Sequence, residues 1–204
     1  MNIQDGVENP RQTLRKGTHG EHVRLNQHPM LEGLTKPGYP IARLGFLLSG
    51  YFHIYRALEL AITSLPVDGF SYASRKKLPW LIQDLEHFGI DPESTGYRPY
   101  GPLATPAPID AAELAGMLYT IEGSTMGGQV ISRHLATHLG ITPAMGCRFF
   151  HAYGDHTATR WNEFEAFLNA SLADRQQCER ALATAKATFG CIETILDEYH
   201  ARSE

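Results

Sequence analysis

Three glycines lie inside a predicted helix. A bulky ligand can approach a helix backbone only where side chains are missing. The helix is expected over residues 110–139, because Asp110 is a favourable N-cap and Gly140 a favourable stop. The segment 123–128, GSTMGG, interrupts it, although each glycine costs about 1 kcal/mol relative to alanine. Missing side chains admit either a flat ligand or a closely crossing helix, and the pattern alone favours neither. A phosphate loop is disfavoured because no Gly-Lys-Ser/Thr follows.

His22 is a candidate metal ligand in the first predicted helix, which begins after Pro10. Helical spacing puts it on the inward face with Leu14 and Leu25. Asn26 follows one turn later, where its carbonyl could accept a hydrogen bond from Nδ1–H and leave Nε2 for a metal. A lone histidine on an apolar face is nevertheless more often a core residue with satisfied hydrogen bonds. Both interpretations stay open at this point.

The remaining histidines and cysteines form no recognised metal motif. His134 and His138 are four positions apart but lack the glutamate of a His-Glu-x-x-His site. Cys147, Cys178 and Cys191 include no Cys-x-x-Cys pair, which disfavours a disulfide framework, a thiolate zinc site and covalently attached haem. A di-iron bundle needs Glu-x-x-His on two helices, and the sequence contains none.

The composition is that of an ordinary folded protein. Of the 204 residues, 43% are hydrophobic and 20% are charged, so we expect a single domain over residues 1–204, with a flexible tail over 1–10. The net charge of −4 without a lysine or arginine cluster disfavours nucleic acid as a partner. The most apolar stretch, residues 46–55, is too short to span a membrane, and no secretory core is evident. We therefore expect a cytoplasmic protein, which also suits three unpaired cysteines.

Apolar residues recur at helical spacing along most of the chain, which predicts an all-α fold. Besides the helices already described, we expect helices over residues 41–65 and 77–88, one capped by Thr157 and one beginning at Asp174. The segment 89–108 contains five prolines and is predicted to be a long loop.

Three separated segments resemble the haem oxygenase family, and a fourth resembles its bacterial branch. Residues 14–22, LRKGTHGEH, are similar to its Leu-Lys/Arg-x-x-Thr-x-x-x-His segment, and residues 52–59, FHIYRALE, to its His-Ile-Tyr-x-Ala-Leu-Glu segment. Residues 119–131, YTIEGSTMGGQVI, resemble its kinked distal helix. Ser124 and residues 153–161, YGDHTATRW, resemble the bacterial branch, including enzymes that accompany bacteriophytochromes. The resemblance implies a single-domain, all-α haem oxygenase-like fold with a kinked, Gly-rich distal helix.

The resemblance assigns the glycines and the histidine to a haem site. It implies that His22 is the axial ligand of the haem iron. It also implies that Gly123 and Gly127 lie over the opposite face of the haem, where a bend leaves space for O₂. This favours the ligand interpretation of the glycines over the packing one.

Four more residues take expected roles from the same resemblance. Arg15 and Tyr119 are the expected partners of the haem propionates, because guanidinium donors can pair with both carboxylate oxygens. Tyr55 and Ser124 are expected in a distal network of hydrogen-bonded water. Their structural alternatives are a solvated charge for Arg15, a packing ring for each tyrosine and a backbone-bonded hydroxyl for Ser124.

Two departures from the family pattern limit this transfer. Neutral Asn26 stands where mammalian members have a glutamate, which should push less electron density onto the iron through the imidazole. The family's Thr-Gly-x-Arg-Trp reads TATRW at residues 157–161, so no propionate role is assigned to Arg160.

The activity that the resemblance implies is the opening of haem b with O₂ to biliverdin, with release of CO and Fe²⁺. Haem is then both substrate and cofactor. A separate reductase or ferredoxin-type donor must supply electrons, because the chain has no dinucleotide fingerprint or flavin motif. The product would serve a bacteriophytochrome or iron recovery. The competing interpretations are a non-catalytic haem chaperone or sensor, a thiamin-degrading enzyme of similar scaffold and a helical interaction module.

Overall fold

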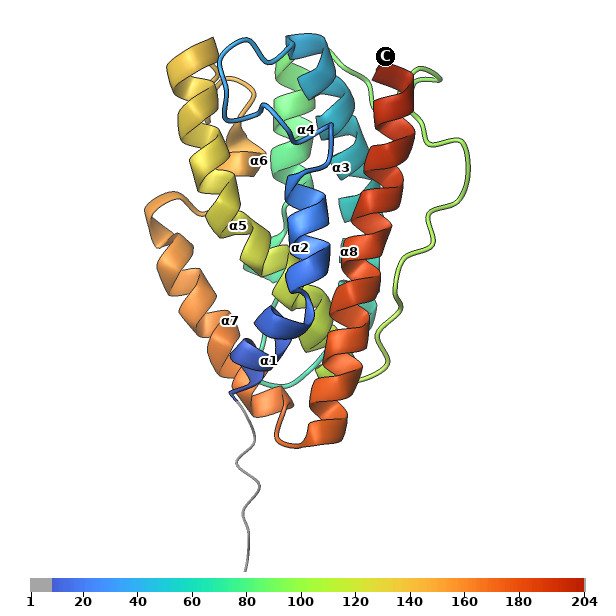
Figure 1. Ribbon diagram of the computed structural model, residues 1–204, viewed down its shortest axis with the longest axis vertical. Helices are drawn as coiled ribbons and strands as arrows, with labels where there is room; N and C mark the ends of the chain where they lie inside the picture. Colours follow the sequence, from blue (N-terminus) through green and yellow to red (C-terminus); the bar gives the residue numbers. More distant parts are fainter. Residues whose placement is uncertain (1–8, 204) are drawn as a thin grey trace, which may run out of the picture.

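The computed structural model describes residues 9–203, and helices build almost all of this part of the chain (Figure 1). Two short 3-10 turns, Ala73–Arg75 and Gly154–His156, join them, and the described residues contain no strand beyond an isolated bridge between Val67 and Phe70. The predicted all-α class is therefore confirmed. The helices are α1 (Pro10–Gly17), α2 (His19–Asn26), α3 (Ile41–Ser64), α4 (Leu78–His87), α5 (Ala111–Leu139), α6 (Arg148–His151), α7 (Thr157–Ser171) and α8 (Arg175–Ser203).

The two longest helices, α5 and α8, pack against each other and form the centre of the molecule. Gly116 allows their backbones to approach closely, because a Cβ atom placed there would lie 2.0 Å from the carbonyl oxygen of Ala181. Leu114 and Leu118 of α5, and Ile195 and Leu196 of α8, are fully or almost fully buried. Burial of such side chains stabilises the fold by roughly 1.5–3 kcal/mol each. The helix that carries the glycine segment is thus anchored at its N-terminal half.

The first predicted helix is two helices in the structure. Asn9 caps α1 by accepting a hydrogen bond from the backbone N–H of Arg11 at 2.9 Å. At Thr18 the backbone leaves the helical region, and the buried Thr18 hydroxyl donates to the carbonyl of Leu14 at 2.8 Å. Both α1 and α2 pack mainly on α8 and run in front of α5 in Figure 1. The expected tail over residues 1–10 falls outside the described residues except for Asn9 and Pro10, the first residue of α1.

The predicted proline-rich loop is confirmed over residues 89–108, which contain no helix. It follows the outer side of α8 in Figure 1. The Tyr199 hydroxyl donates to the carbonyl of Tyr97, and the Arg202 guanidinium donates to the carbonyls of Gly96 and Arg98. These contacts bind the loop to the last turns of α8.

Most helix ends agree with the sequence prediction, and one cap does not. Asp110 accepts from the backbone N–H of Glu113 at 2.9 Å, and Gly140 ends α5 with φ of 68°, as expected. Thr157 was expected to cap α7 but is its first residue, and its hydroxyl donates to the carbonyl of Gly154 at 2.8 Å. The backbone stays helical through GSTMGG, so the kink in α5 stays a prediction.

The helix α6 was not predicted, because four residues carry no periodic signal. Its first N–H groups, of Arg148 and Phe149, donate to the buried carboxylate of Asp84 at 2.7 and 2.8 Å. A contact from α4 therefore holds this short helix in place. None of the helices within residues 9–203 has the length and apolar content needed to cross a bilayer.

Candidate functional site

The glycines of α5 fall into two groups according to what surrounds them. A Cβ at Gly128 would lie 2.7 Å from the carbonyl oxygen of Phe150, so this glycine is required by the packing of α6. A Cβ at Gly127 would meet nothing within 4 Å, and one at Gly123 only a ring carbon of Trp161 at 3.8 Å. No neighbouring helix explains Gly123 and Gly127, whereas one explains Gly128. The packing interpretation therefore holds for one of the three.

His22 lies in the middle of α2 with its side chain exposed, so the expected inward orientation is wrong. The ring makes an edge contact with Phe189 of α8, at 6.4 Å between centroids. The helix has eight residues, packs mainly on α8 and contains no buried residue, so His22 keeps access to solvent beside Phe189. Among the described residues, the imidazole Nε2 has no hydrogen-bond partner.

Asn26 contacts His22 as expected, but through the opposite end of its amide. Its Nδ2 lies 3.2 Å from Nδ1 of His22, whereas the sequence predicted that the amide oxygen would accept from Nδ1–H. With Nδ1 as acceptor, the neutral imidazole carries its proton on Nε2. A half-turn of the Asn26 amide presents its oxygen instead, which moves the proton to Nδ1 and frees the Nε2 lone pair.

Two cations of α1, Arg11 and Arg15, act electrostatically on Tyr119. Tyr119 is half-buried on α5, and burial raises the pKa of its hydroxyl. The Thr18 side chain and the positive charges of Arg11 and Arg15 act on this pKa in the opposite direction. The Arg15 side chain is exposed, while Arg11 lies over the Trp161 ring of α7 at 5.4 Å.

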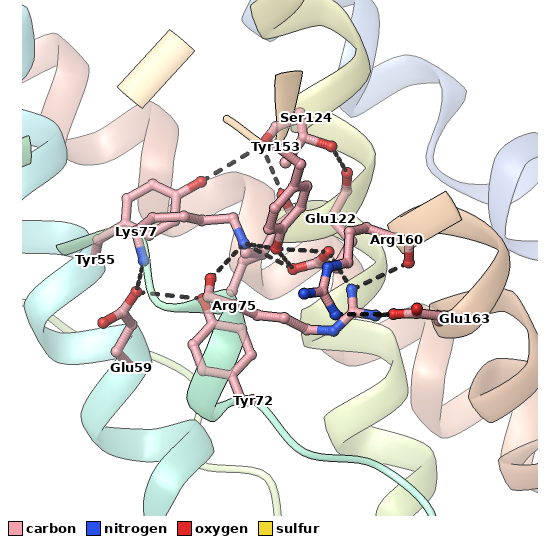
Figure 2. A network of polar contacts seen from close by, with 12 residues as sticks. Tyr55, Glu59, Tyr72, Arg75, Lys77, Glu122, Ser124, Tyr153, Arg160 and Glu163 are labelled. Atoms are coloured by element: carbon pink, nitrogen blue, oxygen red, sulfur yellow. Dashed lines mark hydrogen bonds and ion pairs between the residues drawn. The ribbon is translucent and has the colours of Figure 1, made fainter. Parts of the chain in front are cut away.

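Tyr55 and Ser124, which the family resemblance assigned to one network of hydrogen-bonded water, contact each other directly. Their hydroxyl oxygens are 3.4 Å apart (Figure 2). Tyr55 is buried on α3 against Phe149, whereas Ser124 is exposed and donates to the carbonyl of Ile121 at 2.7 Å. Burial raises the pKa of Tyr55 above its usual range, so its phenol stays protonated and can donate a hydrogen bond.

A cluster of buried charged residues lies next to this pair of hydroxyls, and the sequence analysis did not predict it. We define the cluster as Arg75, Lys77, Glu122 and Tyr153, with Glu59 adjoining it. Lys77 Nζ donates to Glu122 at 2.7 Å and to the Tyr153 hydroxyl at 2.9 Å, and Arg75 donates to Glu122 at 2.8 Å (Figure 2). The sequence feature that could have indicated this cluster is Glu122, a charged residue directly after the mostly apolar residues 114–121.

A sequence model of the family described as "Heme oxygenase" matches residues 9–198, which is almost the whole chain. The chain belongs to the haem oxygenase family. A haem oxygenase from Xanthomonas campestris pv. campestris (strain 8004) is 32% identical over 136 residues, which cover 66% of this chain and 74% of that protein. The resemblance that the sequence motifs carried is thereby confirmed.

Solved haem oxygenases have the same fold. The enzyme from Leptospira interrogans superposes with a TM-score of 0.77 at 18% identity, covering 94% of this chain and all (100%) of that one. The NO- and CO-bound haem oxygenase of Neisseria meningitidis gives 0.76 at 19% identity, covering 96% and 94% of the two chains. The haem complex of haem oxygenase-1 from Synechocystis sp. PCC 6803 gives 0.71 at 16% identity, again covering 96% and 94%.

The chain is therefore a haem-binding, haem-degrading oxidoreductase of this family. Family membership disfavours the thiamin-degrading enzyme, the interaction module and the non-catalytic haem binder among the interpretations of the sequence.

Proposed function

We propose that this haem oxygenase holds haem b between α2 and the side of α5 that carries Gly123 and Gly127. The observation that carries the proposal is that these two glycines face no protein atom within 3.5 Å of an added Cβ, although helix stability disfavours them. A flat macrocycle can contact the backbone there at van der Waals distance. The donor set fits haem as well, because His22 is an exposed imidazole whose Nε2 has no partner among the described residues.

His22 is the proposed axial ligand of the iron. A metal takes the deprotonated nitrogen of a neutral imidazole, so the Asn26 amide has to present its oxygen to Nδ1–H. The edge of the Phe189 ring restricts the rotation of the imidazole. Bound haem supplies the iron that activates O₂ and is itself the substrate whose ring is opened. Because Asn26 is uncharged, it leaves the imidazole less electron-rich than a carboxylate would.

Arg15 and Tyr119 are the proposed partners of the haem propionates. Arg15 is exposed and its positive charge acts on the Tyr119 hydroxyl, which favours a carboxylate that accepts from both. Charge-assisted hydrogen bonds of this kind are about twice as strong as neutral ones. They orient the macrocycle in its plane, and this orientation decides which ring edge is presented to the distal side.

Ser124 and Tyr55 are the proposed distal hydroxyls that hold water and deliver protons near the glycines. Neither is a strong acid or base, because burial keeps the Tyr55 phenol protonated. Haem bound there would supply the O₂ chemistry, and these two hydroxyls would supply protons through water rather than from a strong acid. Gly123, Gly127, Ser124 and Tyr55 therefore form the proposed catalytic set.

Turnover of the purified protein tests this function. One equivalent of haem should give a histidine-ligated spectrum, and reductant plus O₂ should then produce biliverdin with release of CO and Fe²⁺. Biliverdin is identified by chromatography of the extracted pigment, which also gives the isomer. A Soret band that persists after prolonged reduction in air would show that the chain only binds haem.

A separate donor is the proposed source of electrons, either a reductase or a ferredoxin-type protein. Similarity to bacterial enzymes that accompany bacteriophytochromes leads us to propose a cytoplasmic role in which biliverdin is supplied as a chromophore to such a receptor or is formed during iron recovery. Deleting the gene should abolish the chromophore absorbance of such a receptor, and added biliverdin should restore it. Normal absorbance with impaired growth on haem as iron source would point to iron recovery.

A further inference from the structure

The cations of the buried charge cluster converge on one carboxylate of α5. The side chains of Arg75, Lys77 and Glu122 are 3%, 1% and 1% exposed. One Glu122 oxygen accepts from Lys77 at 2.7 Å, the other accepts from Arg75 at 2.8 Å, and the Tyr153 hydroxyl lies 3.1 Å from both. Glu122 thereby joins α5 to the chain before α4 and to the chain before α7.

A second carboxylate, Glu59, holds the same segment from the side of α3. It accepts hydrogen bonds from the backbone N–H groups of Lys77 and Leu78 and from the Tyr72 hydroxyl. Lys77 therefore binds Glu59 through its backbone and Glu122 through its side chain (Figure 2). Residues 75–78, which we call the strut, thus connect α3 to α5 through hydrogen bonds to Glu59 and Glu122.

The two carboxylates flank the distal hydroxyl pair in the sequence. Glu59 is one turn after Tyr55 on α3, and Glu122 is two residues before Ser124 on α5. The strut thus fixes the spacing of the two helices where the Tyr55 and Ser124 oxygens lie 3.4 Å apart. That contact is near the upper limit of a hydrogen bond, so a small shift of either helix would break it.

Stability does not explain why this cluster is charged. Buried ion pairs gain little over well-packed apolar side chains, because desolvation offsets the attraction between the charges. Burial lowers the pKa of Lys77, and the negative charge of Glu122 opposes that effect. Positional specificity is the established alternative use of a buried polar group.

We propose that Glu122 is a positioning residue of haem oxygenation, which, together with Lys77, holds the Ser124 hydroxyl against that of Tyr55. This inference rests on the proposed role of those two hydroxyls. It assigns to Glu122 no contact with haem. Glu122→Gln should therefore leave haem affinity unchanged while it slows ring opening.

A double-mutant cycle with Ser124→Ala tests whether Glu122 acts through Ser124. Glu122→Gln should slow biliverdin formation about tenfold in the wild-type background and less than twofold in the Ser124→Ala background. The Kd for haem should stay within about twofold throughout. An equal loss of rate in both backgrounds, or a parallel loss of haem affinity, would overturn the proposal.

A measurement on the ligand-free protein does not depend on turnover. The ¹³Cζ resonance of Tyr55, assigned with Tyr55→Phe, should move in the same direction in Glu122→Gln as in Ser124→Ala. Glu163→Gln is the matched control, because Glu163 pairs with the other side of Arg75 at 2.8 Å but is 49% exposed. An unmoved Tyr55 resonance in Glu122→Gln would refute the inference, whereas absence of biliverdin from the wild type would refute the proposed function.

A second variant, with two apolar substitutions, tests the proposal if Glu122→Gln does not fold. Lys77→Met with Glu122→Leu removes one charge of each sign and keeps similar volume, while Arg75 keeps its ion pair with Glu163, so the thermal midpoint should fall by less than in Glu122→Gln. The Tyr55 resonance should still shift, and turnover should still fall about tenfold. A well-folded double variant with wild-type turnover and an unshifted resonance would contradict the proposal.

Discussion

The glycines of α5 serve opposite purposes at different positions along the helix. At two closed positions, Gly116 and Gly128, backbone from α8 and α6 approaches, and an added Cβ would lie 2.0 and 2.7 Å from a carbonyl oxygen. At two open positions, an added Cβ at Gly127 would meet nothing within 4 Å and one at Gly123 only Trp161 at 3.8 Å. Glycine in a helix therefore indicates function only where no neighbouring backbone explains it. Alanine substitution separates the two cases, because it clashes at the closed positions and fits at the open ones.

The largest effect is expected at Gly116. Gly116→Ala drives a methyl group into the backbone of Ala181, which has no flexible side-chain atom to move away. We expect a loss of more than about 3 kcal/mol in the free energy of unfolding, at or above the usual range for overpacking. Denaturant unfolding of the ligand-free protein measures it. A midpoint like that of the wild type would show that α5 and α8 are not closely packed.

A pH effect should follow at Asp84, which binds the first N–H groups of α6, the helix that approaches Gly128. Burial raises the pKa of its carboxyl to about 6 from the model-peptide value of 3.8, despite two backbone N–H donors. The folded protein then binds the proton more tightly than the unfolded chain, so this contribution to stability is complete below pH about 4 and is lost as pH rises through about 6.

Comparison with Asp84→Asn isolates this contribution. Between pH 4 and 7 the wild type should lose up to about 3 kcal/mol relative to the variant, as a shift of roughly two units implies. Unfolding curves at several pH values measure the difference. Parallel pH profiles would mean that the carboxyl titrates normally in the folded protein.

Gly128→Ala should cost about 1–3 kcal/mol, less than at Gly116, because the clash with Phe150 is milder and α6 is short. Thermal unfolding should show a lower midpoint. A midpoint equal to or above that of the wild type would place Gly128 with the glycines at open positions.

The smallest change in stability is expected at Gly127, and it has the opposite sign. Gly127→Ala meets no atom and improves helix propensity, so the ligand-free protein should gain up to about 1 kcal/mol. The same methyl group should slow biliverdin formation, because it occupies the proposed distal face. A stabilised variant with unchanged turnover would contradict the assignment of Gly127 to the haem site.

The sequence predicts well what depends on local pattern. Residues 110–139 have a capping aspartate and a terminal glycine, and α5 has those ends. The break at Thr18 was missed because Gly17 and Gly20 weaken a helix without specifying where it divides. The structure shows that Gly17 packs against Leu182, a contact 165 positions away that no local pattern encodes.

The site was predictable only in part, for the same reason. Family motifs named Tyr55 and Ser124, and the structure brings their hydroxyls together. No local signal pairs Lys77 with Glu122, which are 45 positions apart and become partners only when α5 packs beside the chain before α4. The exposure of His22 was also missed, because helical periodicity does not show which face is left uncovered by other helices.

The proposed haem site depends most directly on His22 as the residue that holds the iron. The decisive measurement is the absorption spectrum of the haem complex of His22→Ala, with His19→Ala as the matched control, because both side chains are exposed on α2. The account predicts that His19→Ala keeps the histidine-ligated spectrum, whereas His22→Ala loses it and regains it with added imidazole. A wild-type spectrum in His22→Ala without imidazole would contradict it.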